Sequence, residues 1–404
     1  MLRCFSRVPG RSDELERGSC SRQFSISTVD EVRDGLVTLF LGGDVMTGRG
    51  VDQILPHPGD PRLWETSVDD ARTYVELAEA ANGPIARPVP FSWPWGSALE
   101  VLDTAAPDAC VINLETSVTY SDDVAPGKAV HYRMSPENLP CLSVARPCVY
   151  TVANNHVMDF GASGLEETLS ALVSAGFATA GAGRDLSEAR RPAVITVRDF
   201  RVVVLALGAR SSGIPDTWAA TTHRAGVDLL PDLSPATAGE IAARVQQVKR
   251  PGDVVVASLH WGSNWGHGVP AEHVGFAHRL IDGGVDVVHG HSSHHPRPIE
   301  VYAGKLILYG SGDLIDDYEG IGGYESYRDD LRLQYFASVD PASGRLALLE
   351  MAPLQARQMR LDHASSEDAE HLRRVVDRIS RDFGSRIARN PDGMLQLLSA
   401  DTSS

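Results

Sequence analysis

The chain has no run of 18 or more consecutive apolar residues, which is about the length that a membrane-spanning helix needs. Basic side chains are also in short supply, since 37 Lys and Arg stand against 53 Asp and Glu, for a net charge of -16. A chain of this charge repels nucleic-acid phosphates and anionic membrane surfaces over long range. We therefore expect no nucleic-acid partner and no membrane anchor.

Cysteine is sparse and unpatterned. The five cysteines are odd in number and form no CxxC pair, and Cys4 and Cys20 lie in the N-terminal tail. Cys110 and Cys148 stand beside valines, a setting typical of buried thiols. We expect no structural disulfide here, which points to a reducing compartment or to a chain indifferent to redox state. A cytoplasmic location is the prediction.

The N-terminus lacks the apolar centre of a secretory signal. Residues 1–33 are rich in Arg and Ser, but acidic residues dilute the positive charge of a transit peptide, so we predict a disordered leader. The remainder, with 43% hydrophobic and 22% charged residues, has the composition of a soluble globular protein. Its length permits two or three average domains, or one α/β domain with insertions.

Short apolar runs, too compact for helices, recur from residue 34 onward. They contain Val, Ile and Leu without polar alternation, which is typical of strands buried on both faces. Helical patterns at 163–175 and 271–282, each ended by glycine, lie between some of them. This alternation predicts an α/β fold. The predicted strands cover residues 36–42, 109–114, 149–153, 202–207, 254–259, 285–290 and 306–310.

We predict one domain over residues 34–365. Its regular rhythm is broken near 56–94 and 209–235, which read as insertions. Residues 332–340 and 345–351 predict an antiparallel pair of strands. The segment 366–404 predicts an amphipathic helix, around 366–384, followed by a polar tail.

Five of the predicted strands end at side chains that bind metals or move protons. In α/β sheets, ligands collect beyond the carboxyl ends of the strands, where the loops converge. Taken singly, each residue has a structural explanation, such as a turn for Asp44 or a hydrogen-bonded core position for His260. Together they are ligand types of a hard or borderline divalent ion and predict a metal site. The residues are Asp44, Glu115, Asn155 with His156, His260 and His291.

Two other motifs compete with the metal site. GHSSH at 290–294 nearly matches the elbow that presents a nucleophilic serine, but His294 replaces the final glycine and no helix-forming run follows. GDVMTGRG at 43–50 approximates a phosphate-binding loop, but Arg49 and Gly50 replace its Lys and Ser/Thr. Both motifs are weaker than the metal site.

These residues resemble the CapA-type family, named for a component of poly-γ-glutamate capsule synthesis, within the calcineurin-like metallophosphatase superfamily. The resemblance implies an α/β fold of the four-layer α/β/β/α sandwich type, with one or two divalent ions (Mn, Fe or Zn) at one end. The matching stretches are GDVMTGRGVD (43–52), INLETSVT (112–119), YRMSPENL (132–139), 152–185, SLHWGSNWG (258–266) and 284–315.

The resemblance also implies roles for single residues. His156 matches a histidine that donates to the substrate or leaving group, and Asn155 matches the ligand beside it. Arg49 could neutralise substrate charge if it points inward; a solvated surface position is the alternative. Met46 stands where the superfamily usually has a ligating histidine, which leaves open one ion or two. The implied metal ligands are Asp44, Glu115 (bridging), Asn155, His260, His291 and His294.

Three functions fit this pattern. The first is a metal-dependent hydrolase, most naturally of a phosphate ester, that activates a water molecule. The second is a non-hydrolytic role in poly-γ-glutamate or capsule biosynthesis, and the third is metal-dependent hydrolysis of an amide. In each case we expect an anionic small molecule or polymer as partner; the sequence indicates no oligomeric state.

Overall fold

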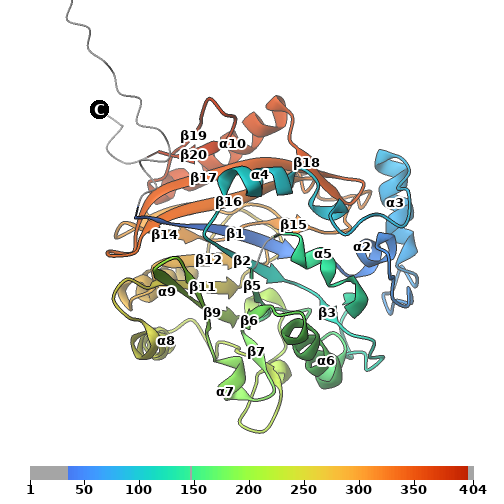
Figure 1. Ribbon diagram of the computed structural model, residues 1–404, viewed down its shortest axis with the longest axis horizontal. Helices are drawn as coiled ribbons and strands as arrows, with labels where there is room; N and C mark the ends of the chain where they lie inside the picture. Colours follow the sequence, from blue (N-terminus) through green and yellow to red (C-terminus); the bar gives the residue numbers. More distant parts are fainter. Residues whose placement is uncertain (1–34, 146–147, 399–404) are drawn as a thin grey trace, which may run out of the picture. The chain divides into compact units, whose positions relative to one another are not determined.

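The computed structural model describes residues 35–145 and 148–398, and the predicted leader therefore lies outside the described residues (Figure 1). Within these ranges the strands build one ten-stranded and one six-stranded sheet, besides two small two-stranded ones. No described helix is long and apolar enough to cross a bilayer. The prediction of an α/β fold is confirmed, while the domain boundaries stay predictions.

The ten-stranded sheet is mixed. Its N-terminal part, β1, β2, β5 and β6, is parallel, and β15 also runs parallel to β1. The strands predicted near 332–340 and 345–351 are β16 and β17, which pair antiparallel as expected. The strands are β1 (Val37–Val45), β2 (Ala109–Leu114), β5 (Val149–Thr151), β6 (Ala178–Ala180), β15 (Asp313–Ile315), β16 (Leu331–Asp340), β17 (Arg345–Arg357), β18 (Arg360–His363), β19 (Ile387–Arg389) and β20 (Leu395–Leu397).

The six-stranded sheet has a parallel centre. β9, β11, β12 and β14 run parallel, and β8 and β13 close the two edges antiparallel. Its strands are β8 (Ala193–Val197), β9 (Phe200–Gly208), β11 (Val254–His260), β12 (Val287–His291), β13 (Ile299–Tyr302) and β14 (Lys305–Leu308).

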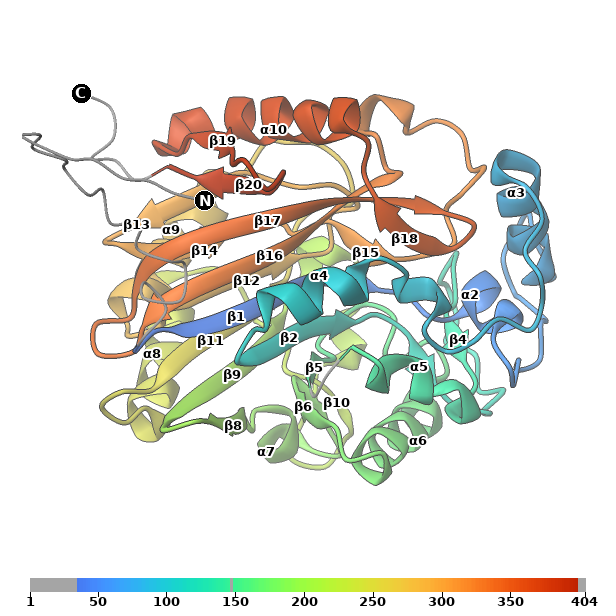
Figure 2. The same ribbon diagram turned by 45° about the horizontal axis from the view of Figure 1, so that its top comes forward.

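The two sheets pack face to face, with helices on both outer faces (Figure 2). In β9, Val202 and Val204 belong to the core between the sheets, whereas Val203 and Leu205 belong to the core under the outer helices. This is why the strand is apolar at every position. The α/β/β/α layering is therefore confirmed. Helices α8 (Pro235–Val248) and α9 (Ala271–Asp282) cover the six-stranded sheet, and α4 (Ala98–Ala105), α5 (Pro140–Ser143) and α6 (Gly161–Ser174) cover the other.

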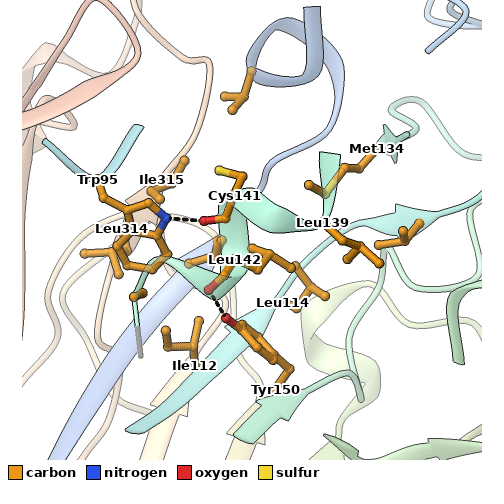
Figure 3. Close-up of a cluster of buried hydrophobic side chains, with 14 of the residues drawn as sticks. Trp95, Ile112, Leu114, Met134, Leu139, Cys141, Leu142, Tyr150, Leu314 and Ile315 are labelled. Atoms are coloured by element: carbon orange, nitrogen blue, oxygen red, sulfur yellow. Dashed lines mark hydrogen bonds between the residues drawn. The ribbon is translucent and has the colours of Figure 1, made fainter. Parts of the chain in front are cut away.

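A dense apolar cluster lies on the helix side of the ten-stranded sheet (Figure 3). Trp95 is fully buried in it and donates from its indole nitrogen to the Cys141 carbonyl at 2.8 Å. Ile112 and Leu114 point from β2 into the same cluster. Because side chains alternate along a strand, Asn113 between them faces the opposite side.

The irregular segments carry short elements. The segment 56–94 holds α3 (Arg72–Asn82), which packs on α2 (Arg49–Ile54), and the segment 209–235 holds β10 (Gly226–Val227). The predicted C-terminal helix is α10 (Ser366–Ser380). Leu372 and Val376 of α10 reach into the core between the sheets.

The prediction of free thiols at Cys110 and Cys148 is wrong, because the structure joins them in a disulfide with a Cα–Cα distance of 4.5 Å. β2 and β5 are adjacent parallel strands, with Val111 opposite Val149. The two cysteines that precede these valines therefore also stand opposite each other. This proximity follows from strand register, which the local sequence around either cysteine does not contain.

Candidate metal centre

The predicted ligands lie where parallel strands of both sheets end. Asp44, near the end of β1, stands in register with Asn113 of β2, and His260 of β11 stands in register with His291 of β12. The two pairs belong to different sheets that face each other. Their side chains consequently meet at one rim of the sandwich.

Three of the predicted ligands form a compact group. Asp44, His260 and His291 each offer one ligand atom, and these atoms lie within 4.8 Å of one another. Nδ1 of His260 is 2.9 Å from Nδ1 of His291, which in turn is 3.6 Å from Oδ1 of Asp44. All three side chains are buried. One carboxylate and two imidazoles in this spacing could hold a divalent ion.

Gly43 places Asp44 in this group. The register of β1 against β2 shifts between Gly42 and Asp44, so Gly43 forms a bulge. A Cβ atom on Gly43 would lie 1.8 Å from the carbonyl oxygen of Gly312. Gly312 directly precedes β15, which pairs with β1. Only glycine permits this approach, which lets the Asp44 amide donate to Gly312 at 3.1 Å.

Glu115 and Asn155 flank the group on the side of His260. Nε2 of His260 is 3.8 Å from Oε1 of Glu115 and 2.8 Å from Oδ1 of Asn155. The neighbouring Asn154 instead satisfies backbone groups, since its Oδ1 accepts from the amides of His156 and Val157. Glu115 and Asn155 therefore lie beside the group, whereas Asn154 supports the backbone of the turn. That Glu115 and Asn155 bind metal stays a prediction.

Asn113 is a member that the sequence analysis gave no role. Its amide nitrogen donates to Oδ1 of Asp44 at 2.7 Å and lies 3.3 Å from Oε2 of Glu115. It also lies 3.4 Å from Nδ1 of His260. Asn113 therefore holds three candidate ligands around a single donor group.

His156 faces the same carboxylate oxygen of Glu115 as His260 does. Its Nε2 is 3.8 Å from Oε1 of Glu115, and its Nδ1 is 2.6 Å from Oδ2 of Asp159. Lys128 forms an ion pair with Asp159 and also contacts the Asn155 carbonyl. Burial, opposed by Asp159, lowers the pKa of His156 to about 4. The ring is therefore neutral near pH 7, with its Nε2 edge toward the centre.

His294 stands apart from the compact group. Its Nδ1 is 3.0 Å from both carboxylate oxygens of Asp313, and its Nε2 is 2.9 Å from the side-chain nitrogen of Asn264. The turn that carries it contains Ser292 at φ 96°, a conformation that favours glycine. This turn lets the Ser292 amide donate to Oδ2 of Asp44 at 2.9 Å.

The electrostatics of the centre favour a cation. Burial, and then the charge of Asp313, raise the pKa of Asp44 to about 7. Burial, and then the charge of Asp44, raise the pKa of Glu115 well above its usual range. Burial lowers the pKa values of His260 and His291, so both imidazoles are neutral and have lone pairs to offer. The donor set therefore fits a divalent ion, which would neutralise the crowded carboxylates.

Arg49 points inward, but its guanidinium is already paired. It donates to both oxygens of the buried Asp317 and to Oε1 of Glu65 at 3.0 Å. Its Cζ lies 3.8 Å from the Tyr74 ring centroid and 4.4 Å from that of Tyr132. Tyr132 in turn meets the His156 ring edge-to-face at 4.5 Å between centroids. Arg49 is thus one aromatic ring away from His156 and is not a solvated surface arginine.

Asp159, Asp313 and Lys128 were missed by the sequence analysis. Asp159 follows His156 by three residues, a spacing that could have drawn attention to it. Asp313 opens a short strand beside Asp44, and that pairing is set by the fold alone. Lys128 lies on a loop between strands, where no local pattern marks it.

Comparison with known proteins identifies a family and several similar proteins. Residues 38–318 match the family described as "Bacterial capsule synthesis protein PGA_cap". The chain is 54% identical over 367 residues to a Mycobacterium tuberculosis protein named "Probable polyglutamine synthesis accessory protein", covering 90% of this chain and 97% of that one. It is 26% identical over 303 residues to "PGA biosynthesis protein CapA" of Bacillus subtilis, covering 75% and 68%. It is 22% identical over 341 residues to "Capsule biosynthesis protein CapA" of Bacillus anthracis, covering 83% and 72%.

Proposed function

Because the chain belongs to the bacterial capsule synthesis protein family PGA_cap, we propose that it is a metal-dependent hydrolase, acting on a phosphate ester, that serves the synthesis of an anionic polymer. The observation that carries this proposal is the buried group of Asp44, His260 and His291 beside the His156–Asp159 pair. A resemblance to metallophosphatases supports the same reaction. The names of the relatives support the biosynthetic setting.

The residues that would hold the ion are the predicted set. Asp44, His260 and His291 form its core, and Glu115, Asn155 and His294 complete it. A divalent ion there would lower the pKa of a bound water and stabilise charge on a phosphoryl or carbonyl oxygen.

The chain's own proton chemistry lies at Nε2 of His156. Asp159 accepts the proton of Nδ1 and so fixes the orientation of the ring. Nε2 then presents a lone pair toward Glu115 and the centre. An anionic substrate beside this ring favours its protonated form, which can donate to a departing oxygen. Lys128 steadies this arrangement by pairing with Asp159. Arg49 would act indirectly, through the Tyr132 ring.

A second candidate is hydrolysis of a γ-glutamyl amide by the same centre. The resemblance to poly-γ-glutamate capsule synthesis proteins favours it, because that polymer contains γ-glutamyl amide bonds, and relatives named for polyglutamine and PGA synthesis support the same setting. The chemistry is compatible, because a Lewis acid polarises a carbonyl as it does a phosphoryl group. A non-hydrolytic accessory role is the outcome if neither bond is cleaved. Our cytoplasmic prediction rested partly on free thiols, and the Cys110–Cys148 disulfide removes that support.

The test begins with metal content and calorimetric titration of the full chain with Mn²⁺ and Zn²⁺. Hydrolysis of p-nitrophenyl phosphate, bis(p-nitrophenyl) phosphate and a γ-glutamyl oligopeptide follows, for wild type and for His156→Ala and His291→Ala. His289→Ala is the matched control, because His289 is equally buried in the same strand but is not a predicted ligand. We expect His291→Ala to lose metal and activity, and His156→Ala to keep metal and lose turnover. Absence of metal binding would refute the proposal, and metal binding without cleavage would replace it by the accessory role.

A further inference from the structure

Two aromatic side chains lie face to face beside the candidate metal centre, and the proposed function does not use them. Trp265 lies in the loop after β11, and Tyr324 lies in the connection from β15 to β16. Their ring centroids are 4.0 Å apart, and their planes are 4° from parallel. Trp265 is half-buried, with its ring centroid 5.2 Å from that of His294, whereas Tyr324 is 37% exposed. We call Trp265 and Tyr324 the aromatic shelf, and its exposed ring is that of Tyr324.

The loop that carries Trp265 runs along the end of β12. The Trp261 amide donates to the His291 carbonyl at 3.3 Å. The Ser292 hydroxyl donates to the Gly262 carbonyl at 3.4 Å, and the Ser292 amide donates to Oδ2 of Asp44 at 2.9 Å. The shelf therefore lies beyond the carboxyl ends of the strands that carry His291 and Asp44, which is the side where α/β sheets bind their ligands.

One buried cation fixes both ends of this loop. Arg297 is 4% exposed and donates to the carbonyls of Ser263 and Gly268, each at 2.7 Å. The Ser263 hydroxyl in turn donates to the Trp265 carbonyl at 2.8 Å. A surface that is already ordered loses little conformational entropy when a ligand binds to it. Binding on the shelf therefore needs no reordering of the loop.

The exposed side chains next to the shelf in the sequence are uncharged or acidic. Ser263 and Asn264 precede Trp265, and Glu325 follows Tyr324. The face of an aromatic ring is electron-rich, so it attracts a second flat ring or the C–H groups of a ring. The carboxylate of Glu325 repels anions. The shelf consequently suits an uncharged ring better than a chain that carries carboxylates.

We propose that the aromatic shelf binds a flat, uncharged ring in the leaving group of the phosphate ester, against the exposed face of Tyr324. The ring would be a nucleobase or a sugar, and the metal centre would hold the phosphoryl group of the same molecule. This inference rests on the proposed function and names its class of substrate. Tyr324 is then a residue that determines specificity.

The experiment compares the affinities of three phosphate esters by calorimetry on the Mn²⁺-loaded full chain. A His156→Ala background, in which we expect metal binding without turnover, keeps the esters intact during the titration. The esters are adenosine 5′-monophosphate, glucose 1-phosphate and glycerol 3-phosphate, which has no ring. We expect the better of the two ring-bearing esters to bind about 10-fold more tightly than glycerol 3-phosphate, since stacking on one aromatic side chain contributes this order of affinity. The better ester also distinguishes a base from a sugar.

Tyr324→Ala should abolish this preference and change the affinity for glycerol 3-phosphate by less than about two-fold. Tyr120→Ala is the matched control, because Tyr120 is also an exposed tyrosine, at 58%, but lies outside the shelf. It should leave all three affinities unchanged, and circular dichroism reports whether each variant is folded.

Two outcomes overturn the inference while the proposed function stands. The first is that the ring-bearing esters bind no more tightly than glycerol 3-phosphate. The second is that Tyr324→Ala weakens the binding of all three esters equally. Mn²⁺ binding and ester hydrolysis by wild type test the proposed function separately. If the Mn²⁺-loaded protein binds none of the esters, the phosphate-ester reaction fails first, and the inference with it.

Discussion

Replacing Asp44 by Asn should stabilise the metal-free protein at neutral pH, although it removes a predicted ligand. Burial and the neighbouring Asp313 raise the folded pKa of Asp44 to about 7, against an ordinary value of 3.8. Between these two values the folded protein binds more protons at this site than the unfolded chain does. The free energy of unfolding therefore falls as pH rises through this window. The destabilisation by ionised Asp44 is fully present above the folded pKa.

The magnitude follows from the difference between the two pKa values. That difference is about 3, which corresponds to about 4 kcal/mol of stability lost between about pH 4 and pH 7. His260 and His291 have lowered pKa values and act in the opposite direction, since their contribution rises with pH. They are present in both proteins, so the informative quantity is the stability of Asp44→Asn minus that of wild type. This difference should grow toward the variant by up to about 4 kcal/mol across the window.

The assay is urea unfolding followed by tryptophan fluorescence, in EDTA, at several pH values. Adding Mn²⁺ should then make wild type the more stable protein. A ligand at 100 times its Kd adds about 2.7 kcal/mol to the free energy of unfolding, and the variant, which lacks one ligand, cannot gain this in full. Asp159→Asn is the control: burial opposes ionisation there, but His156 and Lys128 lower the pKa of Asp159 overall. The contribution of Asp159 to the free energy of unfolding is complete above its unfolded pKa. The stability difference between Asp159→Asn and wild type should therefore not change with pH over the same window. A pH-independent difference for Asp44→Asn in EDTA would refute the reasoning.

Three further predictions concern the frame of the site. Gly43→Ala should destabilise the fold by at least about 3 kcal/mol in urea unfolding, because its Cβ would meet the Gly312 carbonyl, whereas Gly239→Ala, with open space around it, should be neutral or stabilising. Reduction with dithiothreitol should cost about 4 kcal/mol, as expected for a disulfide that closes a loop of 38 residues; equal unfolding midpoints with and without reductant would contradict this disulfide. Arg49→Met should lower the free energy of unfolding by about 3 to 5 kcal/mol, because it leaves Asp317 buried without its cation, and a loss near zero would show that the pair is dispensable.

The strand ends were predictable because each key residue ends or closely follows a run of apolar residues, and that run has a physical reason. A strand buried on two faces must be apolar throughout, so a charged residue directly after it marks the rim of the sheet. His260 and His291 were found in this way, and the structure brings both to Asp44. The antiparallel pair of β16 and β17 was predictable for a similar reason, from local apolar runs separated by a turn.

What escaped prediction depends on contacts between distant strands. Asp313 lies beside Asp44 because β15 returns to β1 after more than half of the chain, and no local pattern encodes that return. The disulfide escaped for the same reason, since it depends on the register of β2 against β5. The resemblance to the CapA-type family implied His294 as a ligand, but it could not show that the His294 ring is paired with Asp313. Whether it binds metal stays a prediction.

The origin of the three grouped side chains has a mechanical consequence. Asp44 belongs to the ten-stranded sheet, whereas His260 and His291 belong to the six-stranded sheet. An ion held by all three would be a cross-link between the two halves of the sandwich, and neither half could bind it alone. The free energy of ion binding and the free energy of packing between the two sheets would then be coupled. A substitution deep between the sheets, far from any ligand, would loosen the ion, and loss of the ion would let the sheets part at that rim first.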